Sequence, residues 1–423
     1  MLDLKFIREN PDLVKAGLAK KFVAVDLDAI LEFDRRRREI LTELEALRSD
    51  RNTVSAEIAR LKKANEDGAA KIAAMKEVGQ KISRLEGEVR EVEEQLNSGL
   101  LTIPNLPHES VPVGKDESAN IEVRAWGEKP KFDFTPAPHW ELGEQHALFD
   151  LARAAKLSGS GFILYTGVGA RLCRALIQFM LDYHQEHHGY LEVSPPFLAN
   201  AKTMTGTGQL PKMAEDMYQL SDETLYLIPT AEVPVTNIFA GEILAAEDLP
   251  KLFVAYTPCF RREAGAHGKD TRGLMRVHQF DKVEMVRIVE PEKSYEELEI
   301  ITSHAEAILQ ALKLPYRVCT LATGDLSFAA AKCYDLEVWA AGVDKFLEVS
   351  SCSNFEDFQA RRMNLRYRPA AGEKPVHPHT LNGSGLALPR TIIAILENYQ
   401  TAEGKIVVPE ALRPYLGGLE IIG

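Results

Sequence analysis

Three stretches decide how this chain folds: Phe260-Arg261-Arg262-Glu263, Arg276-Val277-His278-Gln279-Phe280 and Gly383-Ser384-Gly385-Leu386-Ala387-Leu388-Pro389-Arg390. Arginines from separate stretches suit a bent triphosphate, because a guanidinium stays charged and presents a planar fork of donors to phosphate oxygens. The chain contains neither the glycine-rich phosphate loop that ends in lysine nor the glycine-rich turn of dinucleotide-binding units. The sequence therefore predicts a nucleotide site built on another geometry.

Four further sequence segments accompany the arginine-containing stretches: Thr230-Ala231-Glu232-Val233-Pro234, Lys282-Val283-Glu284, Glu348-Val349-Ser350-Ser351-Cys352-Ser353-Asn354 and Thr380-Leu381-Asn382-Gly383-Ser384. In this order, they resemble motifs 2 and 3 of the class II aminoacyl-tRNA synthetases and, more closely, the seryl-tRNA synthetases, over essentially the whole chain. The resemblance implies an α+β protein. It would have an N-terminal antiparallel helical coiled-coil arm and a class II synthetase-like domain with an antiparallel sheet flanked by helices.

Length and composition are those of a globular protein with more than one core. The 423 residues, of which 45% are hydrophobic and 26% charged, favour two domains. No apolar run approaches the ~20 residues of a membrane-spanning helix, and residues 1–6 lack a secretory or transit pattern. We therefore expect a cytoplasmic protein with no membrane partner. The net charge of −12 does not suggest RNA binding, but a local basic face can still follow phosphates.

Cysteine and histidine patterns bear on metal binding. The cysteines are scattered without a C-x-x-C pair, which argues against a disulfide framework and a cysteine-rich zinc site. His184 and His188 would share one helix face, which a zinc ion could use. A polar helix end before a strand explains them better, since no third ligand is near in sequence. The chain also resembles the metal-free bacterial type of the family, so no zinc is expected.

Residues 27–98 form an island rich in Glu, Lys, Arg, Leu and Ala, with apolar residues every seven positions. A polar break at 64–68 predicts two helices in an antiparallel hairpin, each on the order of 50 Å long. Arg37 and Arg51 interrupt the second row of apolar heptad positions in the first helix. The arginine run 35–38 fits a solvated helix face as well as an RNA contact. The resemblance implies that this arm grips tRNA. The seam positions are Phe33, Ile40, Leu47, Val54 and Leu61, then Met75, Ile82, Val89 and Leu96.

We expect three parts along the chain: a tRNA-binding domain over 1–103, a proline-marked linker over 104–138 and a catalytic domain over 139–423. In the catalytic domain, apolar runs predict strands at 162–165 and 190–193, with a helix between them. Periodicity does not decide the direction of the strands, so the antiparallel arrangement is implied by the resemblance alone.

Arg261 follows an apolar run and would stand at a strand end, with Glu263 on the same face of the pleat. An arginine on a strand is more often part of a surface ion pair. The resemblance instead implies that Arg261 binds the α-phosphate of ATP and that Glu263 reads the adenine amino group. It also implies that Phe280 stacks on adenine and Arg276 reaches the outer phosphates. The loop 265–273 would contact the tRNA acceptor end.

Arg390 follows a proline at the predicted start of a helix over 391–396, where the helix dipole favours an anion. A pair with a nearby acid is the alternative. By resemblance, Glu348 and Ser351 bind ATP and Mg²⁺, a cation that prefers such oxygen ligands. Period-two alternation would place Glu348 beside Ser350, so this pairing requires a bend, and an ordinary half-buried strand is the alternative.

Glu232 and Glu284 lie in apolar surroundings, and a buried acid needs a partner to offset its desolvation. A substrate ammonium or hydroxyl would serve, and so would a core arginine. The resemblance implies a serine site, whose hydrogen bonds to the hydroxyl would reject alanine. The implied catalytic residues are Arg261, Arg390 and Glu348; the ATP-binding residues are Arg261, Arg262, Glu263, Arg276, Phe280, Glu348, Val349, Ser350, Ser351 and Arg390; the serine-binding residues are Thr230, Ala231, Glu232, Arg261, Glu284 and Ser384; the Mg²⁺ ligands are Glu348 and Ser351.

The resemblance predicts an ATP-dependent ligase that activates L-serine as seryl-adenylate and transfers it to the 3′ end of tRNA(Ser). It predicts a homodimer and leaves open whether tRNA(Sec) is also served. A catalytically inactive paralogue that binds RNA or a partner is the alternative, but Arg261, Glu284, Glu348 and Arg390 are all present. A related enzyme that charges a carrier protein would lack the arm.

Overall fold

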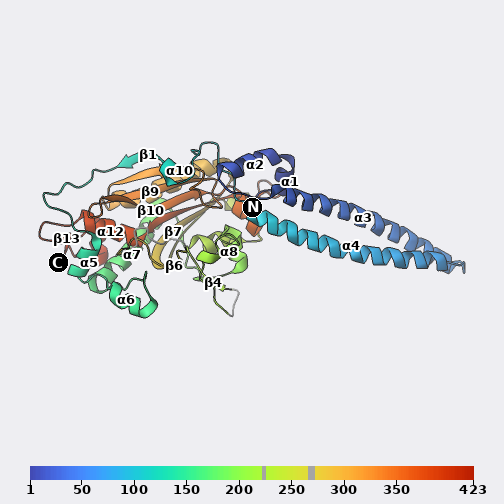
Figure 1. The fold of residues 1–423 in the computed structure, drawn as a ribbon, viewed down its shortest axis with the longest axis horizontal. Helices are drawn as coiled ribbons and strands as arrows, with labels where there is room; N and C mark the ends of the chain where they lie inside the picture. The colour runs from blue at the N-terminus through green and yellow to red at the C-terminus, as the bar shows by residue number, and fades with distance from the viewer. Residues whose placement is uncertain (222–224, 265–271) are drawn as a thin grey trace. The chain divides into compact units, whose positions relative to one another are not determined.

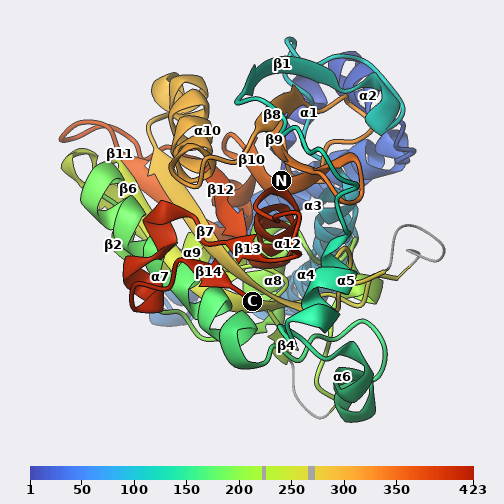
Figure 2. The same cartoon turned by 90° about the vertical axis from the view of Figure 1, so that its left-hand side faces the viewer.

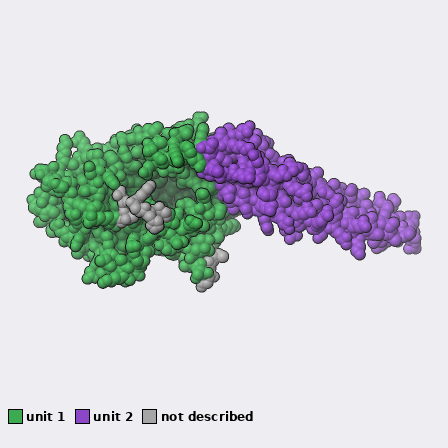
Figure 3. Space-filling model, viewed as in Figure 1, with its two compact units in different colours: residues 1, 20–22, 105–423 green, residues 2–19, 23–104 purple. Residues whose placement is uncertain are grey.

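The computed structural model describes residues 1–221, 225–264 and 272–423, and it divides into two compact units. Unit 2 contains residues 2–19 and 23–104, and unit 1 contains residues 1, 20–22 and 105–423 (Figure 3). Most of the loop expected to contact the acceptor end, residues 265–271, lies outside the described residues. No helix in the described ranges is long and apolar enough to cross a lipid bilayer.

Unit 2 is a helical arm in which two long helices, α3 and α4, run antiparallel and side by side (Figure 1). Helix α3 begins after Asp26, whose carboxylate accepts a hydrogen bond from Ala29 N at 3.0 Å, and it ends where the polar break begins. The predicted helical hairpin is therefore confirmed. The helices of this part of the chain are α1 Leu4–Glu9, α2 Pro11–Lys20, α3 Leu27–Lys63 and α4 Ala69–Thr102.

The heptad seam is buried over only part of its length. Seam residues nearer the turn, such as Val54 and Met75, are half-buried. A two-helix seam without a third partner leaves one side of each side chain open to water, so the pattern specifies helix pairing more than complete burial. The buried cluster between the two helices consists of Ile40, Leu44, Ile82, Leu85 and Val89.

The run of four arginines in α3 is engaged in ion pairs within unit 2. Arg36 lies 3.2 Å from Glu88, and Arg37 lies 2.8 Å from Glu93 on the facing helix. Such pairs across a coiled coil set the register of the helices more than they stabilise them. The remaining pairs of this run are Arg35 with Glu32 and Glu39, and Arg38 with the buried Asp34.

Unit 1 is built on an eight-stranded sheet of order β1-β8-β9-β10-β12-β7-β6-β2, in which β2 is parallel to β6 and the other neighbours are antiparallel. The strands are β1 Ile121–Trp126, β2 Leu191–Glu192, β3 Leu198–Asn200, β4 Leu225–Leu227, β5 Ile243–Ala245, β6 Lys251–Phe260, β7 Gln279–Val289, β8 Tyr316–Thr320, β9 Lys332–Ala340, β10 Lys345–Asn354, β11 Arg366–Arg368, β12 His379–Ala387, β13 Ile406–Val407 and β14 Ile421–Ile422. The helices are α5 His139–Gln145, α6 Leu151–Ser158, α7 Gly167–His188, α8 Ala201–Thr207, α9 Glu232–Thr236, α10 Ser294–Ala311, α11 Phe358–Met363 and α12 Leu388–Asn398.

Helices α7, α10 and α12 cover one face of the sheet (Figure 2). Their apolar side chains share one core with alternate strand residues, such as Val283 and Met285 of β7. Because successive side chains of a strand point to opposite faces, Lys282 and Glu284 lie on the other face. That polar face is where the predicted site residues gather.

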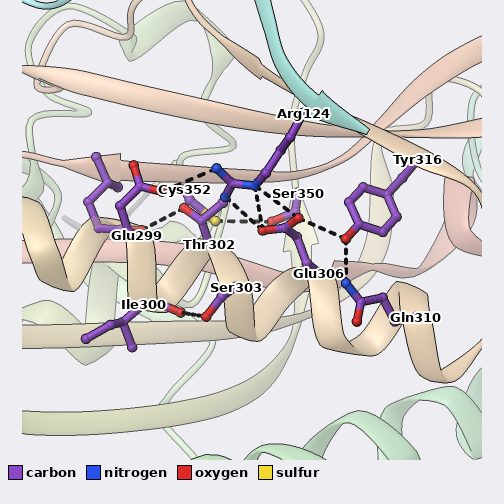
Figure 4. A network of polar contacts seen from close by, with 11 residues as sticks. Arg124, Glu299, Ile300, Thr302, Ser303, Glu306, Gln310, Tyr316, Ser350 and Cys352 are labelled. Atoms are coloured by element: carbon purple, nitrogen blue, oxygen red, sulfur yellow. Dashed lines mark hydrogen bonds and ion pairs between the residues drawn. The ribbon is translucent and has the colours of Figure 1, made fainter. Parts of the chain in front are cut away.

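Residues 104–138, expected as an extended linker, contribute the edge strand β1 to this sheet. Arg124 of β1 bonds to Glu306 of α10 at 2.8 Å and to Glu299 at 3.3 Å, and the hydroxyl of Tyr316 donates to Glu306 at 2.8 Å (Figure 4). A partly buried guanidinium bound by two carboxylates fixes the strand on the helix. The prolines of this segment lie outside β1, so the pairing with β8 is unaffected by them.

Two predicted strands of unit 1 are corrected by the structure. Residues 162–165 form only one bridge, between Tyr165 and Phe149, because Gly161 with φ +79° turns the chain before them and α7 begins directly after. The strand expected at 190–193 is reduced to β2, Leu191–Glu192. Helix α7 does reach His188 and ends at the left-handed Gly189, as the polar helix-end interpretation expected.

Candidate active site

A cavity of about 690 Å³ opens in unit 1, within the size range of ligand sites of about 300–1,000 Å³. It gathers side chains from α8, α9, β7, β9, β10, β12 and α12, together with Arg261 directly after β6, which are far apart in sequence. The side chains of Ala231, Arg262, Glu284 and Ser350 are not among its lining residues. The predicted residues that do line it are Thr230, Glu232, Arg261, Glu263, Arg276, Phe280, Glu348, Val349, Ser351, Ser384 and Arg390.

A β-bulge in β10 brings Glu348 and Ser351 to the cavity. The pairing of β10 with β9 shifts register between Glu348 and Ser350, so one residue is inserted between them. The insertion reverses the alternation, and Ser350 turns inward to donate a hydrogen bond to the Ser384 carbonyl at 2.6 Å. The bend that the pairing of Glu348 with Ser351 required is therefore present in the strand.

The arginine-rich wall of the cavity is held by internal partners. The guanidinium of Arg261 lies 5.1 Å from the centre of the Phe280 ring, and its Nε donates to Pro229 O at 3.4 Å. Arg276 forms an ion pair with Glu263, whose φ of +52° is a conformation that few non-glycine residues adopt. Strained backbone of this kind persists where the surroundings fix it, as at binding sites.

Arg390 lies in the first turn of α12, which begins three residues earlier than the sequence predicted. Its Nη1 is 3.3 Å from a carboxylate oxygen of Glu348 and donates to the Glu348 carbonyl at 2.9 Å. Its Nε donates to Met275 O at 3.2 Å. The nearby acid that was weighed as an alternative partner is thus Glu348, the residue predicted to hold the cation. Arg390 and Glu348 are therefore in direct contact at the wall of the cavity.

The acidic end of the cavity is lined by Glu232, Lys282 and Ser384, and Glu284 contacts the last two without lining the cavity itself. Lys282 Nζ lies 2.6 Å from Glu284, and Ser384 Oγ donates to the same carboxylate at 3.3 Å. Asn382 donates to Glu284 at 2.7 Å and to Glu232 at 3.3 Å, so it bridges the two acids. Among the described residues, Glu232 has amide donors but no ion pair of its own. An ammonium group would complete the charge balance of this pocket.

Burial, with the negative charge of Glu284 added, raises the pKa of Glu232 to about 7. The hydrogen bond from Gln359 and the charges of Lys282 and Arg261 lower that pKa and only partly offset the burial. The charge of Glu232 therefore responds to a cationic ligand, because an adjacent ammonium favours the ionised form.

Three residues of this pocket were missed by the sequence reasoning. Lys282 could have been found, because it lies two residues before Glu284 and therefore on the same strand face. Asn382 stands likewise two residues before Ser384. Gln359 carries no such signal, since its partner Glu232 is 127 residues away in sequence.

The buried pair of His139 and Glu397 holds the main chain of a segment that lines the cavity. Glu397 Oε1 accepts hydrogen bonds from the main-chain N and Nδ1 of His139, both at 2.8 Å. The Nε2 of this ring accepts from Leu274 N at 3.1 Å, which fixes the tautomer with the proton on Nδ1. Leu274 precedes Met275 and Arg276 of the cavity. The pair therefore anchors the main chain whose carbonyl receives Arg390.

Three histidines, of which His184 is buried and His188 and His304 are half-buried, form a second cluster near β12. His184 Nδ1 lies 2.9 Å from His188 Nδ1, and the His188 ring stacks on that of His304 with centres 3.8 Å apart. His184 Nε2 bonds to Gly385 O at 3.2 Å, and the hydroxyl of Tyr190 contacts His304 Nδ1 at 3.1 Å. His184 and His188 do share a helix face, as their spacing predicted. The rings contact one another directly.

This cluster predicts a loss of stability in acid. Burial lowers the pKa of His184 to about 3, of His188 to about 4 and of His304 to about 3. The unfolded chain binds these protons near pH 6.5 (about its reference value), so the free energy of unfolding falls as the pH drops below about 6.5. For His184 the loss between about pH 6.5 and about pH 5 is on the order of 1–2 kcal/mol.

Urea unfolding at these two pH values measures this loss. His184→Gln should reduce the difference in the free energy of unfolding by on the order of 1–2 kcal/mol. His146→Gln serves as the control, because its ring bonds to Gly404 O away from the cluster. An equal pH dependence in both variants would contradict the prediction.

Comparisons with known proteins agree over the whole chain. A family model described as "Seryl-tRNA synthetase N-terminal domain" matches residues 1–107, and one described as "tRNA synthetase class II core domain (G, H, P, S and T)" matches residues 216–399. The serine--tRNA ligase of Carboxydothermus hydrogenoformans is 56% identical over 417 residues, covering 99% of this chain and 98% of that protein. That of Nitratidesulfovibrio vulgaris is 55% identical over 422 residues and 100% of both.

Solved structures agree as well. The seryl-tRNA synthetase of Pyrococcus horikoshii, complexed with ATP, has a TM-score of 0.93 at 41% identity, covering 100% of this chain and 99% of that one. The cytoplasmic serine-tRNA ligase of Naegleria fowleri, in complex with AMP, has a TM-score of 0.89 at 30% identity, covering 100% of this chain and 98% of that one. Both similarities include the helical arm and the sheet, since they extend over the full chain.

Proposed function

The chain belongs to the seryl-tRNA synthetase family, and from that premise we propose how its cavity joins L-serine to ATP and passes the seryl group to tRNA(Ser). The chain is a class II serine--tRNA ligase. The observation that supports this use of the cavity is that an arginine-rich wall and an acidic pocket share one space of about 690 Å³. Phosphates fit the former and an amino acid fits the latter.

In the first step, a carboxylate oxygen of serine attacks the α-phosphorus of ATP in line, and the bond to pyrophosphate breaks. Arg261 contacts the α-phosphate, while Arg276 and Arg390 contact the outer phosphates. Glu263 reads the adenine amino group, and adenine stacks on Phe280. Both reactants are held by side chains of one cavity, so positioning and charge neutralisation supply the catalysis without a protein nucleophile. Arg262, Val349 and Ser350 belong to the same ATP-binding segments.

Serine is held at the acidic end of the cavity. Glu232 and the segment of Thr230 and Ala231 receive the ammonium group, and Glu284 and Ser384 receive the hydroxyl. A site that hydrogen-bonds a hydroxyl leaves its own polar groups unpaired when alanine binds, so alanine is rejected by about 10⁴-fold. Threonine must be excluded by shape, because it carries the same hydroxyl as serine and differs by one methyl group.

In the second step, the terminal ribose hydroxyl of tRNA attacks the carbonyl carbon of seryl-adenylate, and AMP leaves. We assign the grip on tRNA to the helical arm of unit 2, residues 27–98. Because most cations of the 35–38 run are paired with carboxylates, RNA phosphates have to compete with those acids or bind other arm cations. Service of tRNA(Sec) by the same arm is a further part of this proposal.

Mg²⁺ would be held by Glu348 and Ser351. A carboxylate and a hydroxyl on one strand face are oxygen donors of the type that Mg²⁺ prefers, and the bulge in β10 places both at the cavity. The cation would neutralise charge on the phosphates of ATP. Glu348 would then exchange its contact with Arg390 for the metal.

The Mg²⁺ assignment predicts a change in metal dependence. Ser351→Ala should raise the Mg²⁺ concentration for half-maximal ATP–pyrophosphate exchange by about 10-fold, because one ligand is lost. Ser303→Ala, which removes a hydroxyl of α10 bonded to Ile300 O (Figure 4), is the control and should leave it unchanged. The assignment fails if both variants have the metal dependence of the unaltered protein.

Three further features complete the proposal. A homodimer would form at the motif 1 region around Pro195 and Pro196, where Leu191 is 62% exposed at the sheet edge and Phe197 and Leu198 are each 40% exposed. No zinc takes part, since His184 and His188 are bonded to each other. The enzyme works in the cytoplasm.

Charging of tRNA transcripts tests this function. The protein, incubated with ATP, Mg²⁺ and labelled serine, should acylate tRNA(Ser) and not tRNA(Ala), and tRNA(Sec) is included as a third substrate. Acylation of none of them, despite activation of serine, would leave the alternative of a protein that has lost its RNA substrate. The presence of Arg261, Glu284, Glu348 and Arg390 in one site does not favour that alternative.

A further inference from the structure

The carboxamide of Gln359 lies fully buried against Glu232 in the wall of the cavity. Gln359 is the second residue of α11, and its side chain joins three other elements. Its Nε2 donates to Glu232 Oε1 of α9 at 2.7 Å and to Thr207 O of α8 at 3.1 Å. Its Oε1 accepts a hydrogen bond from Thr380 Oγ1 of β12 at 2.7 Å.

The orientation of this carboxamide is forced by its partners. A carboxylate and a main-chain carbonyl only accept hydrogen bonds, so both must face the two N–H donors of Nε2. The oxygen is then left for the Thr380 hydroxyl, which donates. The result is a relay of donors directed at one atom: Thr380 donates to Gln359, and Gln359 donates to Glu232. All three side chains are buried, so the loss of one of these bonds leaves its partner short of a hydrogen bond.

We propose that Gln359 is a positioning residue for serine binding, which holds the Glu232 carboxylate ionised and oriented to receive the substrate ammonium. This inference rests on the proposed role of Glu232 in the serine site. Gln359 itself does not line the cavity, so it acts through Glu232 and not on the substrate.

The charges around Glu232 make the hydrogen bond from Gln359 important for keeping Glu232 ionised. Glu284 of β7 repels the ionised form, while Lys282 of β7 and Arg261 after β6 favour it. Lys282 Nζ pairs with Glu284 at 2.6 Å. The hydrogen bond from Asn382 is also shorter to Glu284, at 2.7 Å, than to Glu232, at 3.3 Å. Gln359 therefore supplies the shortest hydrogen bond that Glu232 accepts. Burial raises the pKa of Glu232 to about 7, and Gln359 opposes that rise.

The loss of this bond should change how serine binding depends on pH. A carboxylate with a pKa raised by burial is protonated below that pKa, and only its ionised form pairs with an ammonium. The KM for serine should therefore fall as the pH rises through the pKa of Glu232. Without Gln359 that pKa moves further upward, so the fall in KM should occur at higher pH.

The experiment is ATP–pyrophosphate exchange with the full chain over about pH 6 to about pH 9, varying serine and ATP separately. Gln359→Met keeps the length of the side chain and removes its donors. At about pH 7 it should raise the KM for serine about 10-fold, with kcat and the KM for ATP changed less than about twofold. Near the upper end of the pH range, Gln359→Met should raise the KM for serine only a few-fold.

Two further variants separate positioning from a structural effect. In a Glu232→Gln background no carboxylate ionises at this position, so adding Gln359→Met should raise the KM for serine less than about twofold. Gln310→Met removes an amide that donates to Tyr316 OH outside the cavity (Figure 4), and should leave the pH profile of KM unchanged. If Gln359→Met does not fold, Gln359→Asn keeps a carboxamide that is one methylene too short to reach Glu232 and Thr380 together, and it should shift the profile upward in the same way.

The outcomes distinguish this inference from the proposed function. If Glu232→Gln weakens serine binding but a folded Gln359 variant keeps both the KM for serine and its pH profile, the positioning role is overturned and the serine site stands. If Glu232→Gln itself leaves the KM for serine unchanged, the assignment of Glu232 fails and this inference fails with it. Exchange with serine in the unaltered protein tests the function independently of both.

Discussion

Arg390→Ala should lower the rate of ATP–pyrophosphate exchange about 100- to 1,000-fold while the protein remains folded. The guanidinium bonds to Glu348 and to Met275 O at the cavity, so its removal takes away a fixed positive charge where phosphate charge develops. Loss of one preorganised donor of this kind is expected to affect the chemical step more than ATP binding. Single-turnover formation of seryl-adenylate, with exchange at saturating ATP, is the measurement.

Arg413→Ala is the matched control for this variant. Arg413 also bonds to a carbonyl, Val408 O at 3.2 Å, and to a carboxylate, Glu420 at 3.2 Å, and its side chain is 30% exposed against 28% for Arg390. It does not line the cavity. If Arg390→Ala catalyses ATP–pyrophosphate exchange as fast as Arg413→Ala, the proposed role of Arg390 is wrong.

Replacement of residues 35–90 by a short Gly/Ser turn should spare serine activation and abolish charging of tRNA(Ser). The ion pair of Arg37 with Glu93 shows that the two ends of this segment lie on facing helices, so a short turn can close the shortened hairpin. The kcat/KM for tRNA should fall by roughly 1,000-fold, equivalent to about 4 kcal/mol of lost binding free energy. Exchange with serine should stay within about twofold, because all lining residues of the cavity belong to unit 1.

The control for the truncation keeps both helices and replaces only residues 64–68 at the turn by the same Gly/Ser sequence. It should charge tRNA far better than the truncated protein. If the truncated protein charges tRNA(Ser) as well as this control, the arm has no role in RNA binding, and the assignment of unit 2 is wrong.

The predicted architecture depended on patterns of very different strength. The seven-residue repeat and the break at 64–68 predicted the hairpin of α3 and α4, because helix pairing follows from local periodicity. Strand β1 was missed, since residues 121–126 lie between proline-marked segments and pair with β8 far along the chain. The run 162–165 was assigned as a strand, although the adjacent Gly161 and the start of α7 limit its pairing to one bridge, between Tyr165 and Phe149.

In the candidate site, too, some features follow from local sequence and others depend on contacts between distant segments. The pairing of Glu348 with Ser351 was expected from the resemblance and required a bend, and the bulge in β10 that provides it depends on register with β9 and is not visible in local sequence. Lys282 follows from strand alternation. Gln359 and the pair of His139 with Glu397 come from elements brought together only by the tertiary fold, so no spacing rule points to them.

ATP–pyrophosphate exchange with each of the standard amino acids, in the presence of Mg²⁺ and without tRNA, tests the central claim most directly. The account predicts exchange with serine alone, because the nucleotide wall and the acidic pocket of one cavity must both be occupied for pyrophosphate to be released and recaptured. Exchange with another amino acid, or with none, would contradict the assignment of Glu232 and Glu284 as the serine pocket.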